Sequence, residues 1–142
     1  MGPLTKEGLD MRMRDIMIVD DSRAMRNFLR RALSMTSLEI GTVHEAENGL
    51  EALHLLDQHT VEVIFSDINM PVMDGAAFVG ELAKSEAKRR IPVIVVSTDN
   101  STERRSQMHS LGAKGYIAKP FSPEQLELEV VRLLWEAADD EY

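Results

Sequence analysis

Cysteine is absent from the 142-residue chain, and long hydrophobic runs are absent as well. Without cysteine the protein has no disulfide, no thiolate metal site and no cysteine nucleophile, and nothing indicates an oxidising compartment. Apolar runs such as residues 91–96 are far shorter than the roughly 18 residues that span a bilayer, and no secretory signal is recognisable. We therefore expect a cytoplasmic protein with no membrane contact.

Positive charge is scarce in this sequence. Sixteen Lys and Arg residues stand against 24 Asp and Glu residues, which gives a formal net charge of −8. Such an excess repels the phosphates of nucleic acids and anionic membrane surfaces, so direct binding to either is not expected. The length suits one domain, and 44% apolar with 28% charged residues is typical of a folded globular protein.

Short apolar runs alternate with amphipathic stretches from Asp15 onward. Runs without polar alternation indicate parallel strands that are covered by helices on both faces. The five predicted strands are residues 16–19, 42–46, 61–65, 92–96 and 115–117. The sequence therefore predicts an α/β fold, a doubly wound (βα)5 sandwich with a five-stranded parallel sheet and right-handed connections.

The intervening stretches have the apolar spacing of helices, each with one stripe facing the sheet. The predicted stripes are Met25, Phe28, Leu29 and Ala32; Ala52, Leu55, Leu56 and His59; and Leu126, Val130, Leu133, Leu134 and Ala137. Asn48, Asn100 and Ser122 are predicted N-caps. We expect a domain over residues 14–138, preceded by a flexible tail (1–13) that could derive from an expression vector and followed by an acidic tail (139–142).

Polar residues follow four of the predicted strands. Asp20 and Asp21 follow the first strand, Asp67 the third, Ser97 the fourth and Lys119 the fifth. With strand order 2-1-3-4-5 all five would meet at one edge of the sheet, and three carboxylates would converge there. Like charges about 4 Å apart repel by about 4 kcal/mol at an effective dielectric of 20, so the cluster calls for a cation. Oxygen ligands favour Mg²⁺, and a carboxylate opposite Mg²⁺ and a lysine is suited to phosphoryl transfer.

Each of these residues also has an ordinary structural interpretation. An acidic pair after a strand is more often a solvated loop or a helix cap. Asp67 could be a turn residue, Lys119 a surface lysine and Ser97 a strand-end cap. Taken together, however, the residues occupy the ends of four strands at one edge, which the ordinary interpretations do not explain.

The order Asp20-Asp21, Asp67, Ser97 and Lys119-Pro120 resembles the receiver domains of bacterial two-component response regulators. Residues 67–75, DINMPVMDG, resemble the phosphoacceptor loop of this family, and residues 115–121, GYIAKPF, resemble its fifth strand. The resemblance extends over about residues 15–138. It implies the flavodoxin-like, CheY-like sheet order 2-1-3-4-5.

The resemblance also implies roles for the residues at the strand ends. Asp67 would accept a phosphoryl group from the phosphohistidine of a sensor histidine kinase. Asp20, Asp21 and Asp67 would bind Mg²⁺ with their side chains, and Asn69 would bind it with its backbone carbonyl. Lys119 would hold the phosphoryl group.

A switch is implied at the far end of the same edge. Ser97 would move toward the phosphoryl group, and the ring of Tyr116 would turn inward into the space that Ser97 vacates. The alternative is that Tyr116 is a static core aromatic with its hydroxyl at the surface. Pro120 matches a proline that is usually preceded by a cis peptide bond, an isomer largely confined to X-Pro bonds.

Two positions depart from the family pattern. Ser97 stands where threonine is commoner, and Thr98 follows where alanine or glycine is usual, so reaction rates could differ while the chemistry is retained. Asn69 and Asp99 occupy the two positions that tune aspartyl-phosphate lifetime in the family.

Other polar residues give weaker signals. His44, His54, His59 and His109 lack ligand spacing and are predicted to be surface residues. Arg23, Arg26 and Arg30 share one face of the first helix, which is expected to be solvated, with docking of an acidic partner as the alternative. Residues 88–90, KRR, are predicted to lie at a helix C-terminus, where cations suit the helix dipole.

Two other functional classes are alternatives to a receiver domain. Haloacid-dehalogenase-like phosphatases need an acid two residues after the nucleophile, where this sequence has Asn69. Flavodoxin-like electron carriers need a hydroxyl-rich and glycine-rich loop after the first strand, where Asp20 and Asp21 would repel a flavin phosphate. We therefore expect a phosphoacceptor switch rather than an enzyme, with only self-catalysed phosphorylation and dephosphorylation.

The residues after Pro120 suffice for one helix and not for an effector domain. The signal is therefore expected to leave through a protein bound at the surface of the fourth helix, fifth strand and last helix. Three interpretations stay open: a single-domain regulator with chemotaxis as a candidate pathway, a phosphorelay intermediate, and a receiver domain cut from a larger regulator or hybrid kinase.

Overall fold

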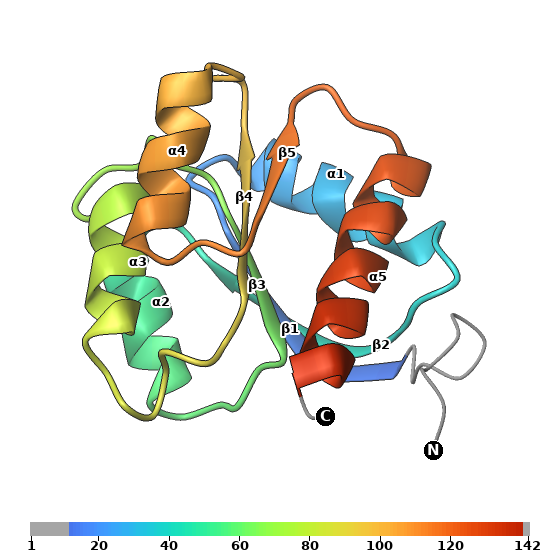
Figure 1. The fold of residues 1–142 in the computed structure, drawn as a ribbon, viewed down its shortest axis with the longest axis horizontal. Coiled ribbons are helices and arrows are strands. Elements are labelled where there is room, and N and C mark those ends of the chain that lie inside the picture. Colours follow the sequence, from blue (N-terminus) through green and yellow to red (C-terminus); the bar gives the residue numbers. More distant parts are fainter. Residues whose placement is uncertain (1–11, 141–142) are drawn as a thin grey trace.

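The computed structural model describes the backbone of residues 12–140 as a three-layer α/β sandwich (Figure 1). Strands and helices alternate along the chain: β1 (Arg12–Val19), α1 (Arg23–Ser34), β2 (Glu39–Ala46), α2 (Gly49–Leu56), β3 (Val63–Ser66), α3 (Gly75–Ala83), β4 (Val93–Ser97), α4 (Thr102–Leu111), β5 (Gly115–Ala118) and α5 (Pro123–Asp140). The strands pair in parallel in the order β2-β1-β3-β4-β5. The predicted fold class and sheet order are confirmed. Within residues 12–140, no helix combines the length and apolarity needed to cross a membrane.

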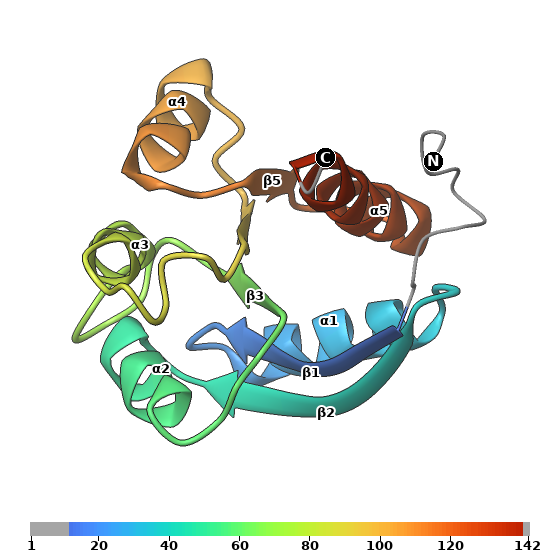
Figure 2. The ribbon, with the colours of Figure 1, turned by 60° about the horizontal axis from the view of Figure 1, so that its bottom comes forward.

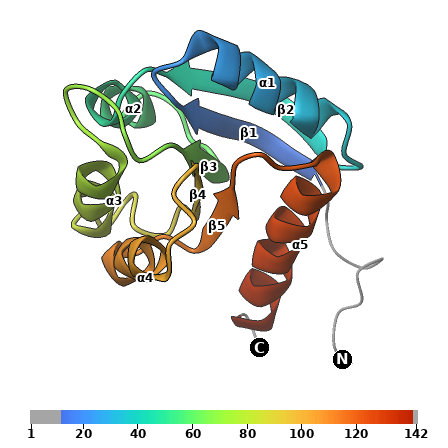
Figure 3. The same ribbon diagram turned by 90° about the horizontal axis from the view of Figure 1, so that it is seen from above.

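Helices cover both faces of the sheet. α1 and α5 lie on one face and α2, α3 and α4 on the other (Figures 2 and 3). Successive residues of β1 point to opposite faces, so that Ile16 and Ile18 join one core cluster while Met17 and Val19 join the other. β3 and β4 are buried along their whole length, as their unbroken apolar runs predict, whereas the edge strand β2 is largely exposed or half-buried.

The predicted helical stripes hold in part. In α5, Leu126, Val130 and Leu133 are buried and Leu134 packs against them, while the side chain of Ala137 lies outside the described part. The prediction was wrong for Phe28, which is 50% exposed because it stands at the flank of α1, edge-on to Phe121 with 5.6 Å between ring centroids. It was also wrong for His59, because α2 ends at Leu56 and His59 lies exposed in the following loop.

Two of the three predicted N-caps are confirmed. The side chains of Asn48 and Ser122 accept the backbone N–H three residues further on, at 2.9 and 3.1 Å. Asn100 is not a cap. α4 begins one residue later than predicted, because Ser101 has the extended backbone of an N-cap and caps the helix, which leaves Asn100 to bind the guanidinium of Arg105.

The domain boundaries differ slightly from those predicted. β1 begins at Arg12 and Met13 is buried, so the tail predicted at 1–13 extends too far into the domain. α5 continues to Asp140, so the predicted acidic tail (139–142) begins inside a helix. Residues 1–11 and 141–142 lie outside the described part of the chain.

Candidate functional site

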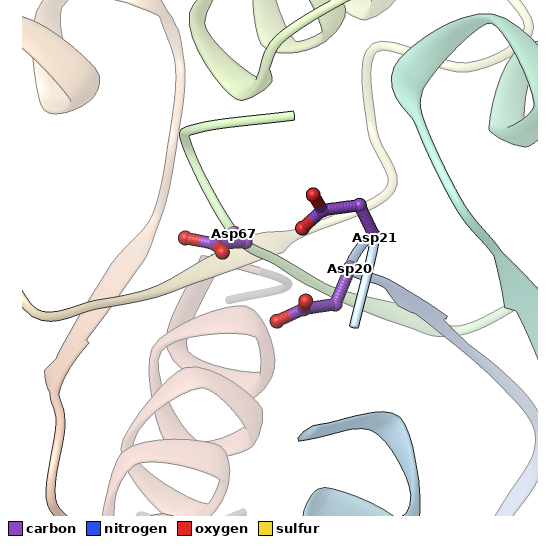
Figure 4. Close-up of side chains that lie close together, drawn as sticks. All are labelled: Asp20, Asp21 and Asp67. Carbon is purple, nitrogen blue, oxygen red and sulfur yellow. The ribbon is translucent and has the colours of Figure 1, made fainter. Parts of the chain in front are cut away.

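Three carboxylates meet at the carboxyl edge of the sheet. Asp20 and Asp21 follow β1, and Asp67 follows β3, the strand beside it (Figure 4). The register pairs Val19 with Ser66, so the residues that follow the two strands are side by side. Each carboxylate offers one oxygen, and these oxygens all lie within 4.8 Å of one another. Three acidic oxygens at this spacing form a possible cation site.

Asp20 is the most deeply buried member of this trio. Its Oδ1 accepts the backbone N–H of Ser22 at 2.8 Å, and its Oδ2 lies 3.4 Å from Nζ of Lys119. Burial raises the pKa of the Asp20 carboxyl above its ordinary value; the Ser22 N–H and the Lys119 charge offset this in part, and the nearby Asp67 charge adds to it. A carboxylate in this position is stabilised by additional positive charge.

A buried arginine supports the same loop from behind. Arg26 donates from Nη1 to the carbonyl oxygen of Asp20 at 2.7 Å and from Nε to Glu45 at 2.8 Å, and Arg30 also binds Glu45 at 2.8 Å. Burial tends to raise the pKa of Glu45, but the hydrogen bonds from Arg30 and Arg26 outweigh it and lower the pKa. The predicted solvated face is therefore wrong for Arg26, which is covered because α1 lies against the end of β2, and right for Arg23, which is exposed.

The loop after β3 fixes the carboxylate of Asp67. The backbone N–H of Ile68 donates to Asp67 Oδ1 at 2.7 Å, and Asp67 Oδ2 lies 3.5 Å from Nζ of Lys119. The first residue of α3 packs directly on this loop, since a Cβ on Gly75 would lie 2.3 Å from the carbonyl oxygen of Asp67. A side chain at position 75 would push the helix away from the loop.

The tip of this loop contains a strained residue. Val72 has a φ of +68°, and the N–H of Met73 donates to the carbonyl of Pro71 at 2.7 Å, which closes a γ-turn with a positive central φ. A β-branched side chain rarely adopts this conformation. Asn69 is exposed at the start of the loop, and the binding of Mg²⁺ by its carbonyl stays a prediction.

The predicted switch residues are linked through one residue of the β4–α4 loop. Ser97, the buried last residue of β4, accepts the N–H of Asp99 on its Oγ at 3.1 Å. The hydroxyl of Tyr116 donates to the carbonyl oxygen of the same Asp99. The Asp99 carboxylate instead accepts the N–H of Ser101 at 3.0 Å, which lowers its pKa. Thr98 is exposed beside this linkage.

The end of β5 completes the edge. The backbone N–H of Lys119 donates to the carbonyl of Ser97 at 2.8 Å, so the lysine is held at the edge formed by its neighbour β4. The Lys119-Pro120 peptide bond is cis, as predicted. The residues that the sequence analysis singled out at four strand ends therefore lie along one edge.

Not every predicted surface residue lies at the surface. His44 is half-buried because it shares a face of the sheet with Met17; its Nε2 lies 3.1 Å from Oδ2 of Asp15, and its ring stacks on His59 at 4.3 Å between centroids. The hydrogen bond from His44 lowers the pKa of Asp15. His44 lies inside a predicted strand, and this position was the sequence signal that its side chain is partly covered. His54, His59 and His109 are exposed, as predicted.

The basic segment at residues 88–90 does not end a helix. α3 ends at Ala83, and these residues lie in turns that lead to β4. Lys88 pairs with Asp57 of the α2–β3 connection at 2.5 Å. The cation therefore joins two loops rather than complementing a helix dipole.

This sheet order, with an acidic trio at its carboxyl edge and a lysine opposite, is the arrangement expected of a receiver domain. The sequence model of the response regulator receiver domain matches residues 16–131. The chain therefore belongs to the response regulator receiver domains, which are switches rather than classical enzymes.

Similar proteins include several from chemotaxis. The chain is 35% identical over 119 residues to chemotaxis protein CheY1 of Helicobacter pylori, covering 82% of this chain and 94% of that protein. The solved structure of chemotaxis protein CheY4 of Vibrio cholerae has 33% sequence identity and a TM-score of 0.73, covering 84% of this chain and 98% of CheY4. The solved structure of the CheX-CheY-BeF3-Mg2+ complex from Borrelia burgdorferi has 25% sequence identity and a TM-score of 0.76. The match covers 84% of this chain and 87% of the chain in that structure.

Other relatives are longer than this chain. It spans 38% of the length of one protein described as a probable transcriptional regulator and 47% of a transcriptional regulatory protein. The family membership is therefore shared by stand-alone proteins and by parts of larger regulators.

Proposed function

We propose that this receiver domain is a Mg²⁺-dependent phosphoacceptor switch in which Asp67 takes a phosphoryl group from the phosphohistidine of a sensor kinase or phosphotransfer protein. The observation that carries the proposal is the acidic trio, whose oxygens lie within 4.8 Å of one another, with Lys119 at 3.5 Å from Asp67. A partner protein would then respond to the phosphorylated state.

The donor set fits Mg²⁺. It consists of carboxylate oxygens from Asp20, Asp21 and Asp67, and the Asn69 carbonyl is a further candidate ligand in the same loop. Magnesium is commonly held by one or two carboxylates together with water and the oxygens of a phosphoryl group. When bound, Mg²⁺ supplies positive charge that offsets the negative charge of the trio and of the phosphoryl oxygens.

The residues of this chain have separate tasks in the transfer. A carboxylate oxygen of Asp67 attacks phosphorus, the new P–O bond forms, the P–N bond to the imidazole breaks, and its electron pair returns to the ring nitrogen. No general base is needed, because an ionised carboxylate carries the attacking lone pair. The Ile68 N–H fixes the orientation of Asp67, and the ammonium of Lys119 attracts the phosphoryl oxygens. Asn69 and Asp99 would tune the rate at which water removes the phosphoryl group.

The output would pass along the linkage at Asp99. A phosphoryl group offers the Ser97 hydroxyl a new acceptor, and movement of Ser97 takes away the oxygen that now accepts the Asp99 N–H. Because the carbonyl of Asp99 also anchors the Tyr116 hydroxyl, that ring gains freedom to turn inward. The surface of α4, β5 and α5 would change with it. Allosteric couplings typically run about 1–3 kcal/mol, so partner affinity should rise roughly 5–150-fold on phosphorylation.

Chemotaxis is the candidate pathway. The chain covers 94% of CheY1 from Helicobacter pylori, a protein of similar length and named for chemotaxis. A phosphorelay intermediate and the receiver part of a longer regulator are the alternatives, and the longer transcriptional regulators among the relatives favour the latter.

The test is phosphorylation of the purified protein by acetyl phosphate with Mg²⁺, followed by intact-mass spectrometry. We expect one acid-labile phosphoryl group on the parent protein and none on Asp67→Asn. Asp57→Asn is the matched control, because it changes an exposed carboxylate that pairs with Lys88 away from the trio, and it should be labelled like the parent. Full labelling of Asp67→Asn would refute the assignment.

A further inference from the structure

A pocket of about 360 Å³ lies at the amino edge of the sheet, opposite the edge that carries the acidic trio; in Figure 1 this edge is at the bottom, where α5 ends. Buried apolar residues of β1, β3 and α5 line it, namely Met13, Val63, Val130 and Leu133. Small-molecule sites are typically mostly apolar cavities of about 300–1,000 Å³ with a few polar groups. The pocket has the size and lining of such a site.

The pocket arises from the unequal lengths of the elements around it. β1 begins at Arg12, but β3 pairs with it only from Ile16 onward, where Ile16 lies opposite Val63. The first residues of β1 therefore project beyond β3. α5 has 18 residues, about 27 Å of helix, and its second half passes the same edge. Apolar surface lies between these two projections, and covering it with hydrocarbon would be favourable.

The mouth of the pocket carries positive charge. Apart from Glu62 and Arg90, the lining side chains in the described part of the chain are aliphatic. Glu62 already has an interaction partner. Arg90 is exposed and, among the side chains that the structure describes, pairs with no carboxylate, whereas Lys88 in the same basic segment pairs with Asp57 at 2.5 Å. The Arg90 guanidinium is thus available to an anion whose apolar part occupies the pocket.

We propose that the pocket binds a medium-chain aliphatic monocarboxylate, such as octanoate, with its hydrocarbon chain inside and its carboxylate paired to Arg90. This site goes beyond the phosphoacceptor function, because it lies at the other edge of the sheet and uses none of the same residues. One cation at the mouth matches one negative charge. An anionic bilayer surface suits the site poorly, because the chain carries a formal net charge of −8.

The first experiment locates the ligand. The protein, labelled with ¹³C in its methyl groups, is titrated with octanoate and intermolecular NOEs are recorded. We expect NOEs from the octanoate chain to the methyl groups of Met13, Val63 and Leu133. Each buried methylene should contribute about 4-fold in affinity, so hexanoate, which is two methylenes shorter, should bind about 15-fold more weakly. NOEs to a different part of the molecule, or equal affinities for the two acids, would overturn the proposal.

The second experiment tests the ion pair with a double-mutant cycle. Arg90→Gln should weaken octanoate binding roughly 1.5- to 5-fold, the range for one exposed ion pair, and should leave the affinity for neutral octanamide unchanged. Arg89→Gln is the matched control, since it removes the same charge from an adjacent exposed residue, and should bind both ligands like the parent. Equal losses for octanoate and octanamide in Arg90→Gln, or no loss for either, would show that Arg90 does not select a carboxylate.

The third experiment fills the pocket. Leu134 and Ile91 line it from opposite sides and are half-buried, so Leu134→Trp and Ile91→Trp can each place a larger side chain in the space. We expect each variant that retains cooperative thermal unfolding to lose octanoate binding. Parent-like affinity in a folded variant would refute the site, and if neither variant folds, the NOEs and the chain-length series decide.

The same NMR samples identify any competing occupant. NOEs from the pocket methyl groups to residues 1–11 in the ligand-free protein would assign the pocket to the chain's own first residues. NOEs between differently labelled copies would assign it to a second copy. Either result would overturn the proposal.

Discussion

The carboxyl edge of the sheet has two halves that are built differently. The acceptor half, at the ends of β1 and β3, contains Asp20, Asp21 and Asp67. The carboxylates of Asp20 and Asp67 accept backbone N–H groups at 2.8 and 2.7 Å, and α3 packs on the loop so closely that only glycine fits at its first residue. The reporting half, at the ends of β4 and β5, contains Ser97 and Tyr116, which are joined by single hydrogen bonds to opposite sides of one peptide segment at Asp99.

The difference shows where this fold concentrates rigidity. A hydrogen bond to a charged group contributes about 1.5–3 kcal/mol, and one between neutral groups about 0.5–1.5 kcal/mol. The acceptor half relies on the first kind, so Asp67, the carboxylate proposed to react, is fixed before any phosphoryl donor arrives. The reporting half relies on the second kind, so its contacts can be exchanged at a cost that one new phosphoryl–hydroxyl contact can offset.

The largest expected effect is in the acceptor half, at the start of α3. Gly75→Ala places a Cβ 2.3 Å from the Asp67 carbonyl oxygen and 2.8 Å from the Cα of Ile68, and should lower the free energy of unfolding by about 3 kcal/mol in urea denaturation. Gly80→Ala is the matched control within the same helix. In the described part of the chain, no atom beyond its own helix backbone and chain neighbours lies within 4 Å of its added Cβ, so it should raise stability by about 0.5–1 kcal/mol. Similar losses in both variants would argue against the close contact of α3 with the loop.

A somewhat smaller effect is expected from Mg²⁺. Because the metal would offset repulsion among three carboxylates, a concentration of one hundred times its dissociation constant should stabilise the protein by about 2.7 kcal/mol. Asp21→Ala should raise stability without metal and reduce the response to metal. Glu86→Ala, an equal charge change at an exposed position away from the site, should do neither. Thermal denaturation with and without Mg²⁺ measures the stability of all three proteins. If Mg²⁺ did not change the stability of the parent protein, the metal site would be ruled out.

The ion pair between Arg26 and Glu45, behind Asp20, should contribute slightly less to the free energy of unfolding. Arg26→Met removes the buried donor to the Asp20 carbonyl and to Glu45, and should cost about 2 kcal/mol in urea denaturation at neutral pH. Arg23→Met, at an exposed position of the same helix, should cost little.

The pH dependence of the stability lost in Arg26→Met shows whether the loss comes from the ion pair or from packing. Arg30 and Arg26 lower the pKa of Glu45 below its ordinary value of 4.5, so the native state binds fewer protons than the unfolded state below that pH. The stabilisation is present above about pH 4.5 and is lost as pH falls through the native pKa. The difference between the parent and Arg26→Met should therefore narrow on acidification. A difference that does not change with pH would mean that Arg26 contributes through packing alone.

The two halves were not equally predictable from the sequence. Unbroken apolar runs in the sequence locate β1, β3, β4 and β5. The residue after each run then lies at the carboxyl edge of the sheet, independently of its side-chain contacts. The acidic trio could therefore be predicted. Contacts between elements could not. Arg26 has the spacing of a solvated face, and its pairing with Glu45 depends on how α1 lies against β2. Asn100 and Ser101 are both good N-cap residues, and only the backbone decides between them.

The smallest expected effect is in the reporting half, at Tyr116. It tests whether the hydrogen bonds at Asp99 contribute as little free energy as proposed. Tyr116→Phe keeps the ring beneath Arg105 and removes the hydroxyl that binds the Asp99 carbonyl, so stability should fall by about 1 kcal/mol or less. The variant should still accept one phosphoryl group from acetyl phosphate, because within the described residues this hydroxyl binds Asp99 and no member of the trio. Freed from Asp99, the ring should turn inward more often, so affinity for a partner bound at the surface of α4, β5 and α5 should rise in the unphosphorylated state, and the further gain in affinity on phosphorylation should shrink. Calorimetric titration of parent and variant with a partner captured by the phosphorylated protein, before and after treatment with acetyl phosphate and Mg²⁺, measures both affinities. An unchanged affinity in the resting state would mean that the hydrogen bond to Asp99 does not restrain the ring, and the linkage from Ser97 to Tyr116 would lose its physical basis.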